Sequence, residues 1–146
     1  MHRINYYTMS RLLNLTPHDI HVFDAKGRTT TIPAFSKGDG ARMKTEEQQY
    51  RGLIAKTDTF DGIPVYTAQI FTKVQWPEGF DAKLAQSVIV SMPVGQYLAK
   101  EADAGRHPGF AVYGPNTGPD PTYGAVRENG QIIGTRSFEL YVAFKV

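Results

Sequence analysis

The groups best suited to binding chemistry gather in residues 107–136, which read HPGFAVYGPNTGPDPTYGAVRENGQIIGTR. Glycines and prolines punctuate the first part of this segment, aromatic side chains lie among them, and two arginines follow. Because glycine reaches positive φ easily and proline stiffens the chain, such a loop can point several backbone N–H groups at an anion. The alternative is a surface connection built from turn residues. No Walker A pattern is present, so the segment is not a P-loop.

A β-hairpin is predicted directly after this loop. The pair Asn129-Gly130, between AVRE and QIIGTR, favours a two-residue type I′ turn. Since side chains alternate between the two faces of a strand, Arg127 and Arg136 would then flank a nearly bare floor on one face. Two guanidiniums so placed suit a phosphate, which arginine binds through two hydrogen bonds. The predicted facing pairs are Glu128 with Gln131, Arg127 with Ile132, Ala125 with Gly134, and Tyr123 with Arg136.

Other interpretations of the hairpin stay open. Both arginines could be solvated on the outer face of an edge hairpin, as basic side chains usually are. Apolar residues of the last strand continue the face of Arg136, and that face is expected to become core. Either a bulge therefore separates Arg136 from these residues, or Arg136 lies at the rim of the core. These residues are Phe138, Leu140, Val142 and Phe144.

The sequence contains no recognisable catalytic motif. His18 and His21 form an H-x-x-H pair, but on a strand this spacing sends the two rings to opposite faces, so no metal site is expected. Ser91 and Ser137 lack the sequence context of a nucleophile elbow. The chain has no cysteine, which excludes disulfides, thiolate zinc sites and a cysteine nucleophile. With no nucleophile, general base, metal or cofactor to name, we expect a binding protein and not an enzyme.

Length and composition limit the class of protein. A chain of 146 residues has the size of one domain, and we expect a flexible arm at residues 1–10 and a single ligand-binding domain at 11–146. A net charge of +2 is too small to favour duplex nucleic acid. No apolar run reaches the roughly 18 residues of a membrane-spanning helix, and the first residues lack the apolar region of a secretory signal. A cytoplasmic protein without membrane contact is therefore expected.

The elements that must position these groups predict an α+β fold, with a mostly antiparallel sheet and one main helix. Ser91 and Pro93 mark the beginning of that helix, and Gly105 marks its end. The strand that begins at Ile63 is long and two-sided, which favours a central position in a sheet. Besides the hairpin, strands are predicted within residues 12–16, 18–24, 28–32, 41–44, 51–60, 63–75, 87–92 and 137–146, with loops at 33–40 and 76–85, the second holding a helical turn near Asp81.

The chain resembles a family of small phage and prophage proteins in segments spread from Leu12 to Phe138. These segments are LNLTPHDIHVFD, IP followed by GARM, GIPVYTAQIF, SVIVSM followed by a helix, and GPNTGPDPTYGAVRENGQIIGTRSF. They are similar to the first-described Thoeris anti-defence proteins. The resemblance implies a sponge, which sequesters the cyclic ADP-ribose signal of bacterial TIR-domain immune proteins without cleaving it. It also implies a homo-oligomer with ligand bound where subunits meet, in the cytoplasm of the infected host bacterium.

The resemblance further implies a site for cyclic di- or trinucleotides of the CBASS system, separate from the cyclic ADP-ribose site. Two other functions stay open: a hydrolase or cyclase acting on a similar nucleotide, and a structural or protein-binding phage factor with no nucleotide ligand. For a cyclic ADP-ribose, the resemblance and the residue types together assign the phosphates to Arg127 and Arg136. The purine would stack on Tyr113, Tyr123 or Phe110, and Asn116 would hydrogen-bond the adenine edge. Thr117 would hold ribose or phosphate, and Arg42 and Lys44 would line the second site.

Overall fold

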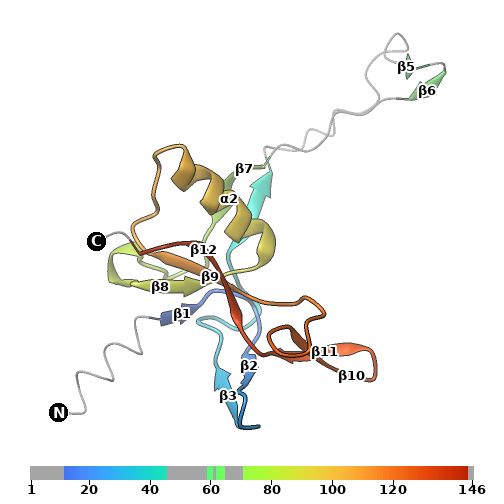
Figure 1. The fold of residues 1–146 in the computed structure, drawn as a ribbon. Coiled ribbons are helices and arrows are strands. Elements are labelled where there is room, and N and C mark those ends of the chain that lie inside the picture. Colours follow the sequence, from blue (N-terminus) through green and yellow to red (C-terminus); the bar gives the residue numbers. More distant parts are fainter. Residues whose placement is uncertain (1–11, 46–58, 61, 65–70, 145–146) are drawn as a thin grey trace. The chain divides into compact units, whose positions relative to one another are not determined.

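The structure of the chain is a computed structural model that describes residues 12–45, 59–60, 62–64 and 71–144. The arm predicted at residues 1–10 and most of the strand predicted at 51–60 lie outside these ranges. Packing divides the chain into two compact units, residues 1–42 with 76–146, and residues 43–75. The elements, most of which are labelled in Figure 1, are β1 (Leu12–Asn14), β2 (Ile20–Phe23), β3 (Thr29–Ile32), β4 (Arg42–Thr45), β5 (Thr59–Phe60), β6 (Ile63–Pro64), β7 (Phe71–Gln75), η1 (Ala82–Leu84), β8 (Ser87–Ile89), α2 (Met92–Asp103), β9 (Ala111–Pro115), β10 (Ala125–Glu128), β11 (Gln131–Thr135) and β12 (Phe138–Val142).

The first sheet of the larger unit has the strand order β1-β8-β9-β12. Helix α2 connects β8 to β9, and a helical crossover of this kind makes the two strands parallel. The helix begins after Ser91, holds Pro93 in its first turn, and is followed by Gly105 at φ 93°, as the sequence predicts. The predicted α+β fold with one main helix is confirmed, and its four-stranded sheets contain parallel as well as antiparallel pairs.

The core of this unit lies between the first sheet and α2. Val88 and Val112 have no exposed surface, and Val94 of the helix is 1% exposed. Two glycines admit the ring of Tyr141 into the same layer, because a Cβ on either Gly95 or Gly114 would collide with that ring. Large apolar side chains and one closely fitted tyrosine therefore fix the helix on the sheet.

The second sheet has the order β10-β11-β2-β3 (Figure 1). Strands β2 and β3, which fall in the strands predicted at 18–24 and 28–32, form an antiparallel hairpin with Gly27 at φ 81° in the turn. Strand β11 lies parallel to β2, with Thr135 beside Val22. Thr135 is 2% exposed and Ile20 is 9% exposed, so this face of the sheet is the inner one.

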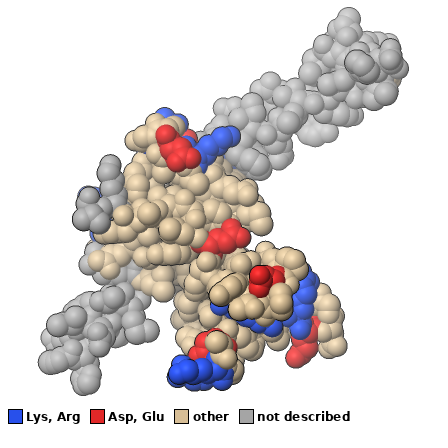
Figure 2. Space-filling view, in the orientation of Figure 1, with Lys and Arg blue, Asp and Glu red and all other residues tan. Residues whose placement is uncertain are grey.

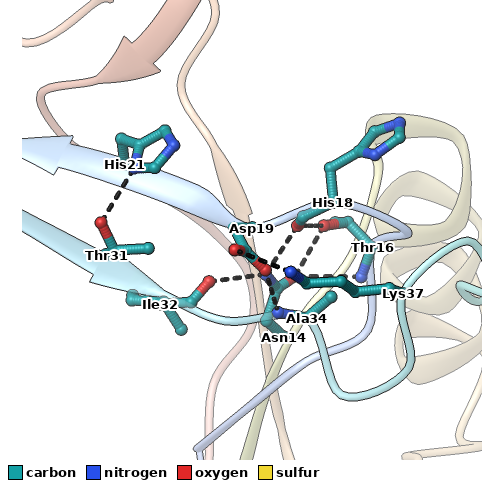
Figure 3. Close-up of polar contacts among 9 residues, drawn as sticks. All are labelled: Asn14, Thr16, His18, Asp19, His21, Thr31, Ile32, Ala34 and Lys37. Atoms are coloured by element: carbon teal, nitrogen blue, oxygen red, sulfur yellow. Dashed lines mark hydrogen bonds and ion pairs between the residues drawn. The ribbon is translucent and has the colours of Figure 1, made fainter.

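A buried asparagine joins β1 to the β2–β3 hairpin (Figure 3). Asn14 is 1% exposed, and its Nδ2 donates to the carbonyl oxygens of His18 at 2.9 Å and Ile32 at 3.0 Å. Its Oδ1 accepts from the backbone N–H of Thr16 at 3.0 Å and from the Thr16 hydroxyl at 2.6 Å. Nearby, Asp19 accepts from Ala34 N at 2.9 Å, and this hydrogen bond is the main cause that lowers the pKa of Asp19. Each polar atom of the Asn14 side chain is thus used in holding the chain together.

The smaller unit contains the hairpin of β5 and β6, which turns at Gly62 with φ 79°, between the strands predicted at 51–60 and 63–75. Strand β7 belongs to a different two-stranded sheet, in which its neighbour is β4. The two ends of the strand predicted from Ile63 to Gln75 thus lie in separate small sheets, and neither has the central position expected. Residues 65–70 of that strand lie outside the described residues.

Two shorter predictions are also confirmed. The helical turn expected near Asp81 is η1, where the Asp81 carboxylate accepts from Lys83 N at 2.9 Å, and the short strand expected at 41–44 is β4. None of the helices in the described ranges is long and apolar enough to span a bilayer.

Candidate functional site

The loop that follows β9 is closed by two of its own side chains. Asn116 Oδ1 accepts from Gly118 N at 2.9 Å. The carboxylate of Asp120 accepts from Thr122 N at 2.7 Å and from Tyr123 N at 3.0 Å. These are the short-range turns that asparagine and aspartate favour, and they give residues 116–123 a defined shape.

Backbone hydrogen bonds complete the closure of this loop. Gly124 N donates to Asp120 O at 2.7 Å, and Ala125 N donates to Gly118 O at 2.9 Å. A Cβ on Gly124 would lie 2.6 Å from Asp120 O, so only glycine fits there. Most backbone N–H groups that were expected to face an anion therefore donate hydrogen bonds within the loop. They do not form the predicted anion-binding concavity. Among the described residues, the backbone N–H groups of Thr117 and Asp120 are the ones in this loop that have no acceptor.

The loop is anchored at the junction of β11 and β12. Asn116 N donates to Ser137 O at 2.9 Å, and the buried hydroxyl of Thr135 donates to Asn116 O at 2.7 Å. The hydroxyl of Ser137 also donates to Tyr123 O. Asn116 therefore has a structural role, since its amide nitrogen lies 3.3 Å from Ser137 Oγ and its oxygen is already an acceptor.

The hairpin turn is confirmed. Asn129 has φ 53° and Gly130 has φ 80°, which are the left-handed values that a type I′ turn requires. Next to the turn the pairing is as predicted, with Arg127 opposite Ile132. Beyond that pair the register shifts between Val126 and Arg127, so the predicted pairs Ala125 with Gly134 and Tyr123 with Arg136 are wrong. The observed pairs are Val126 with Gly134 and Ala125 with Thr135.

This bulge places the two arginines on opposite faces of the sheet. Beyond it, Arg136 N donates to Gly124 O at 3.0 Å, so these two residues face each other. A shift of one residue turns every following side chain to the other face. Arg127 shares a face with Ala125, whereas Arg136 shares a face with Gly134. The prediction that both guanidiniums flank one floor is therefore wrong.

The two guanidiniums also have different surroundings. Arg136 is half-buried, and its Nη1 donates to Ala125 O at 2.6 Å. Hydrogen bonds from the loop backbone lower the pKa of Asp120, and the positive charge of Arg136 contributes to this shift. Arg127 is exposed and its Nη1 lies 3.4 Å from Gly130 O at the tip of the hairpin. In Figure 2, basic and acidic side chains lie next to one another over the lower part of the molecule.

The floor predicted beside the arginines is not bare. A Cβ on Gly134 would lie 2.5 Å from Cε1 of Phe23, because the Phe23 ring packs against this glycine. Strand β2 thus fills, with an aromatic ring, the space that the sequence suggested would be open. Phe23 keeps part of its surface accessible to solvent.

The other predicted ligand-binding residues are dispersed. Phe110 is 1% exposed and packs in a cluster with Trp76 and Phe80, each with its ring centre 5.9 Å from that of Phe110, so it cannot stack on a ligand. Tyr113 is half-buried in β9, and Tyr123 is 61% exposed in the loop. Thr117 is exposed in the same loop. Arg42 pairs with Asp39 at 3.4 Å in the larger unit, whereas Lys44 belongs to the smaller unit.

Sequence reasoning missed a second set of residues that lies beside Arg136. Thr135 and Val22 are neighbours in the parallel pair of β11 and β2, so Arg136 and Phe23 occupy adjacent positions on the opposite face. His21 also points to that face, and its Nδ1 lies 2.9 Å from the hydroxyl of Thr31 (Figure 3). The Phe23 face is defined here by His21, Phe23, Thr29, Thr31, Gly134 and Arg136. Alternation within HDIHVFD predicts that His21 and Phe23 share a face, but nothing local indicates that β11 is their neighbour.

The fold and these surfaces define a small α+β protein with a closed, anchored loop beside an arginine and an aromatic sheet face. Comparison of the chain with protein-family models, with curated proteins and with solved structures found no match. Within the described ranges, no group of three or more histidine or acidic side chains is placed to hold a metal ion.

Proposed function

We propose that this protein binds and sequesters a cyclic nucleotide immune signal of the cyclic ADP-ribose type without cleaving it, and thereby counters bacterial anti-phage defence of the Thoeris kind. Cyclic oligonucleotides of CBASS are a second ligand class for the same protein. The observation that supports binding most directly is the position of Arg136. Its half-buried guanidinium is held by Ala125 O at 2.6 Å where the closed loop meets the second sheet.

Arg136 is suited to a phosphate in this position. A guanidinium has five N–H donors, and the hydrogen bond to Ala125 O uses one of its nitrogens, which leaves donors for a ligand. The fixed orientation reduces the side-chain entropy that binding would otherwise remove. The loop is likewise ordered before any ligand arrives, because its N–H groups are bonded internally. A preformed site favours tight retention of a small ligand, which is what a sponge needs.

Arg127 has a different place in this proposal. It lies on the opposite face of the hairpin, so it contacts the same ligand only where two subunits meet, as the resemblance implies. Tyr123 is the most accessible of the three rings predicted to stack, with 61% of its surface exposed. The cytoplasm of an infected bacterium is the compartment in which such a ligand would be found.

The test is retention of an intact ligand. Purified protein is incubated with cyclic ADP-ribose, separated from free ligand, and heated, and the released compound is identified by mass spectrometry. Recovery of unchanged cyclic ADP-ribose supports sequestration, and recovery of a cleaved product identifies a hydrolase instead. Arg136→Ala should weaken binding at least about tenfold, because a hydrogen bond to a charged group contributes roughly 1.5–3 kcal/mol. Arg106→Ala is the matched control, since Arg106 is an exposed arginine that pairs with Glu101 at the end of α2.

A structural or protein-binding phage factor is the second candidate, and one observation favours it. Strand β12 is an edge strand of the first sheet, and Leu140 on it is 57% exposed. Large exposed apolar side chains on a sheet edge are typical of a surface that pairs with another chain. A thermal-shift screen separates the two candidates, because a ligand that binds only the native state raises the melting temperature. Failure of every cyclic nucleotide to raise it would favour the protein-binding factor.

A further inference from the structure

The Phe23 face combines an aromatic ring, a cationic side chain and hydroxyl groups on one side of the second sheet. We infer that this face is the surface that recognises the nucleotide, with the purine stacked on Phe23 and the phosphate bound by Arg136. The inference rests on the proposed function and deepens it, because it replaces the three rings expected to stack with a fourth that the sequence did not single out.

The placement of the two key side chains follows from strand pairing. Val22 and Thr135 lie side by side in a parallel pair and point to the inner face. Phe23 is the next residue of β2, and Arg136 directly follows the last residue of β11, so both come after this pair on the other face. Neighbouring strands lie about 4.8 Å apart, so a bound base and its attached phosphate can reach both side chains at once.

Gly134 explains why the Phe23 ring can serve as a platform. The ring packs on this glycine, which a Cβ would prevent, since it would lie 2.5 Å from Phe23 Cε1. One side of the ring is thereby supported by backbone, and part of its surface remains accessible to solvent. A ring held in one orientation stacks on a base with little loss of rotamer freedom.

The neighbouring positions add polar groups suited to a ribose. His21 lies two residues from Phe23 on the same strand and face, and Thr31 holds its Nδ1 at 2.9 Å. Thr29 is opposite Phe23 on β3 and is exposed. A hydroxyl and a ring nitrogen beside the stacked base can hydrogen-bond the sugar.

The electrostatics of the face favour a small anion over a long nucleic acid. Arg136 is the arginine among the residues that define the Phe23 face, and its guanidinium is held at Ala125 O of β10. The carboxylate of Asp120 lies close enough for the Arg136 charge to lower the Asp120 pKa. A polyanion needs a row of basic groups. This surface instead suits one phosphate or pyrophosphate attached to a purine.

The experiment compares stacking residues by affinity and by a spectroscopic signature. Binding of cyclic ADP-ribose is measured by calorimetry, and the adenine H2 and H8 resonances are followed by NMR, because a ring stacked on the base shifts them upfield. The variants are Phe23→Leu, which keeps apolar volume without a flat ring, and Phe23→Tyr, which keeps the ring. Tyr123→Leu removes the alternative stacking ring, and Phe144→Ala removes a more exposed aromatic side chain, 50% exposed, that lies outside the Phe23 face.

We expect Phe23→Leu to weaken binding between roughly 5- and 150-fold and to abolish the upfield shift, with Phe23→Tyr and Phe144→Ala close to the parent protein. Circular dichroism and melting temperature establish that each variant is folded. If the parent protein binds cyclic ADP-ribose but Phe23→Leu keeps both the affinity and the upfield shift, the stacking surface is elsewhere while the proposed function stands. If Tyr123→Leu alone removes the shift, the loop is the platform. If the parent protein binds neither cyclic ADP-ribose nor cyclic di-AMP, the proposed function itself fails.

Discussion

The ring of Phe23 occupies the space into which a side chain at position 134 would project. A Cβ added to Gly134 would lie 2.5 Å from Phe23 Cε1 and 2.5 Å from the backbone oxygen of His21. This relationship links β11 to its parallel neighbour β2 and determines which face of the sheet carries an aromatic ring. Gly134 lies opposite Val126 on β10, just beyond the register shift.

Gly134→Ala should therefore destabilise the second sheet. Overpacking a fitted site costs about 1–3 kcal/mol in free energy of unfolding, and here one of the two obstacles is backbone, which cannot rotate away. Urea denaturation of Gly134→Ala, Phe23→Ala and the double variant measures the coupling. The loss in free energy of unfolding caused by Gly134→Ala should be smaller when Phe23 is already alanine. The loss that remains measures the clash of the new Cβ with the His21 carbonyl oxygen. Equal costs in both backgrounds would show that the ring does not constrain position 134.

Asn14 should be among the polar residues most important for stability. Replacing it with alanine removes the partner of Ile32 O and of the Thr16 N–H, while His18 O keeps only the Thr16 hydroxyl at 3.0 Å, and buried unpaired groups cost about 1–3 kcal/mol each. We expect Asn14→Ala to lower the free energy of unfolding by about 3–4 kcal/mol. Thr16→Val, which removes only a hydroxyl, should cost about 1 kcal/mol. Similar values for the two variants would mean that the asparagine network is not a unit.

The features predicted correctly from the sequence are those determined by neighbouring residues. Asn129-Gly130 specified a type I′ turn because few residues tolerate positive φ twice in succession. Ser91, Pro93 and Gly105 bracket the helix for equally local reasons. The pairing of β2 with β3 required only a short turn between two β-prone segments.

The features that were missed depend on contacts distant in sequence. The bulge in β11 moves Arg136 to the face opposite Arg127, and the Gly134 beyond it packs against Phe23 of β2, more than a hundred residues earlier. Phe110 looked like one more aromatic residue of a loop, yet it packs against Trp76 and Phe80 in a buried cluster. Neither fact has a local signal, since both need the strand order to be known first. Arg127 and Arg136 therefore lie on opposite faces, and Phe23 lies on the face of Arg136.

Asp120 should control the order of the loop. Its carboxylate accepts from the N–H groups of Thr122 and Tyr123, and these hydrogen bonds, with Arg136 adding, lower its pKa below the ordinary 3.8. A carboxyl with a lowered pKa supports the folded loop above its ordinary pKa and loses that support as pH falls through the folded value. Hydrogen exchange at Thr122 and Tyr123 should therefore be faster in Asp120→Ala at neutral pH. Asp120→Asn, which keeps an acceptor oxygen, should exchange more slowly than Asp120→Ala, and equal protection in all three proteins would contradict this role.

Tyr141 should make the fold sensitive to high pH. Burial between α2 and β9 raises the pKa of Tyr141 from 10.0 to about 12, and the charge of Glu139 and a hydrogen bond to it add to the shift. Because the folded pKa is above the unfolded one, the neutral phenol contributes stability that is complete below pH 10 and is lost as pH rises through about 12. Tyr141→Phe keeps a ring in the slot made by Gly95 and Gly114 but has no proton to lose, so its free energy of unfolding should fall less over that interval. The difference between the tyrosinate absorbance titrations of the two proteins isolates Tyr141 from the other tyrosines, and a midpoint of that difference near 10 would show that the hydroxyl is not buried as described.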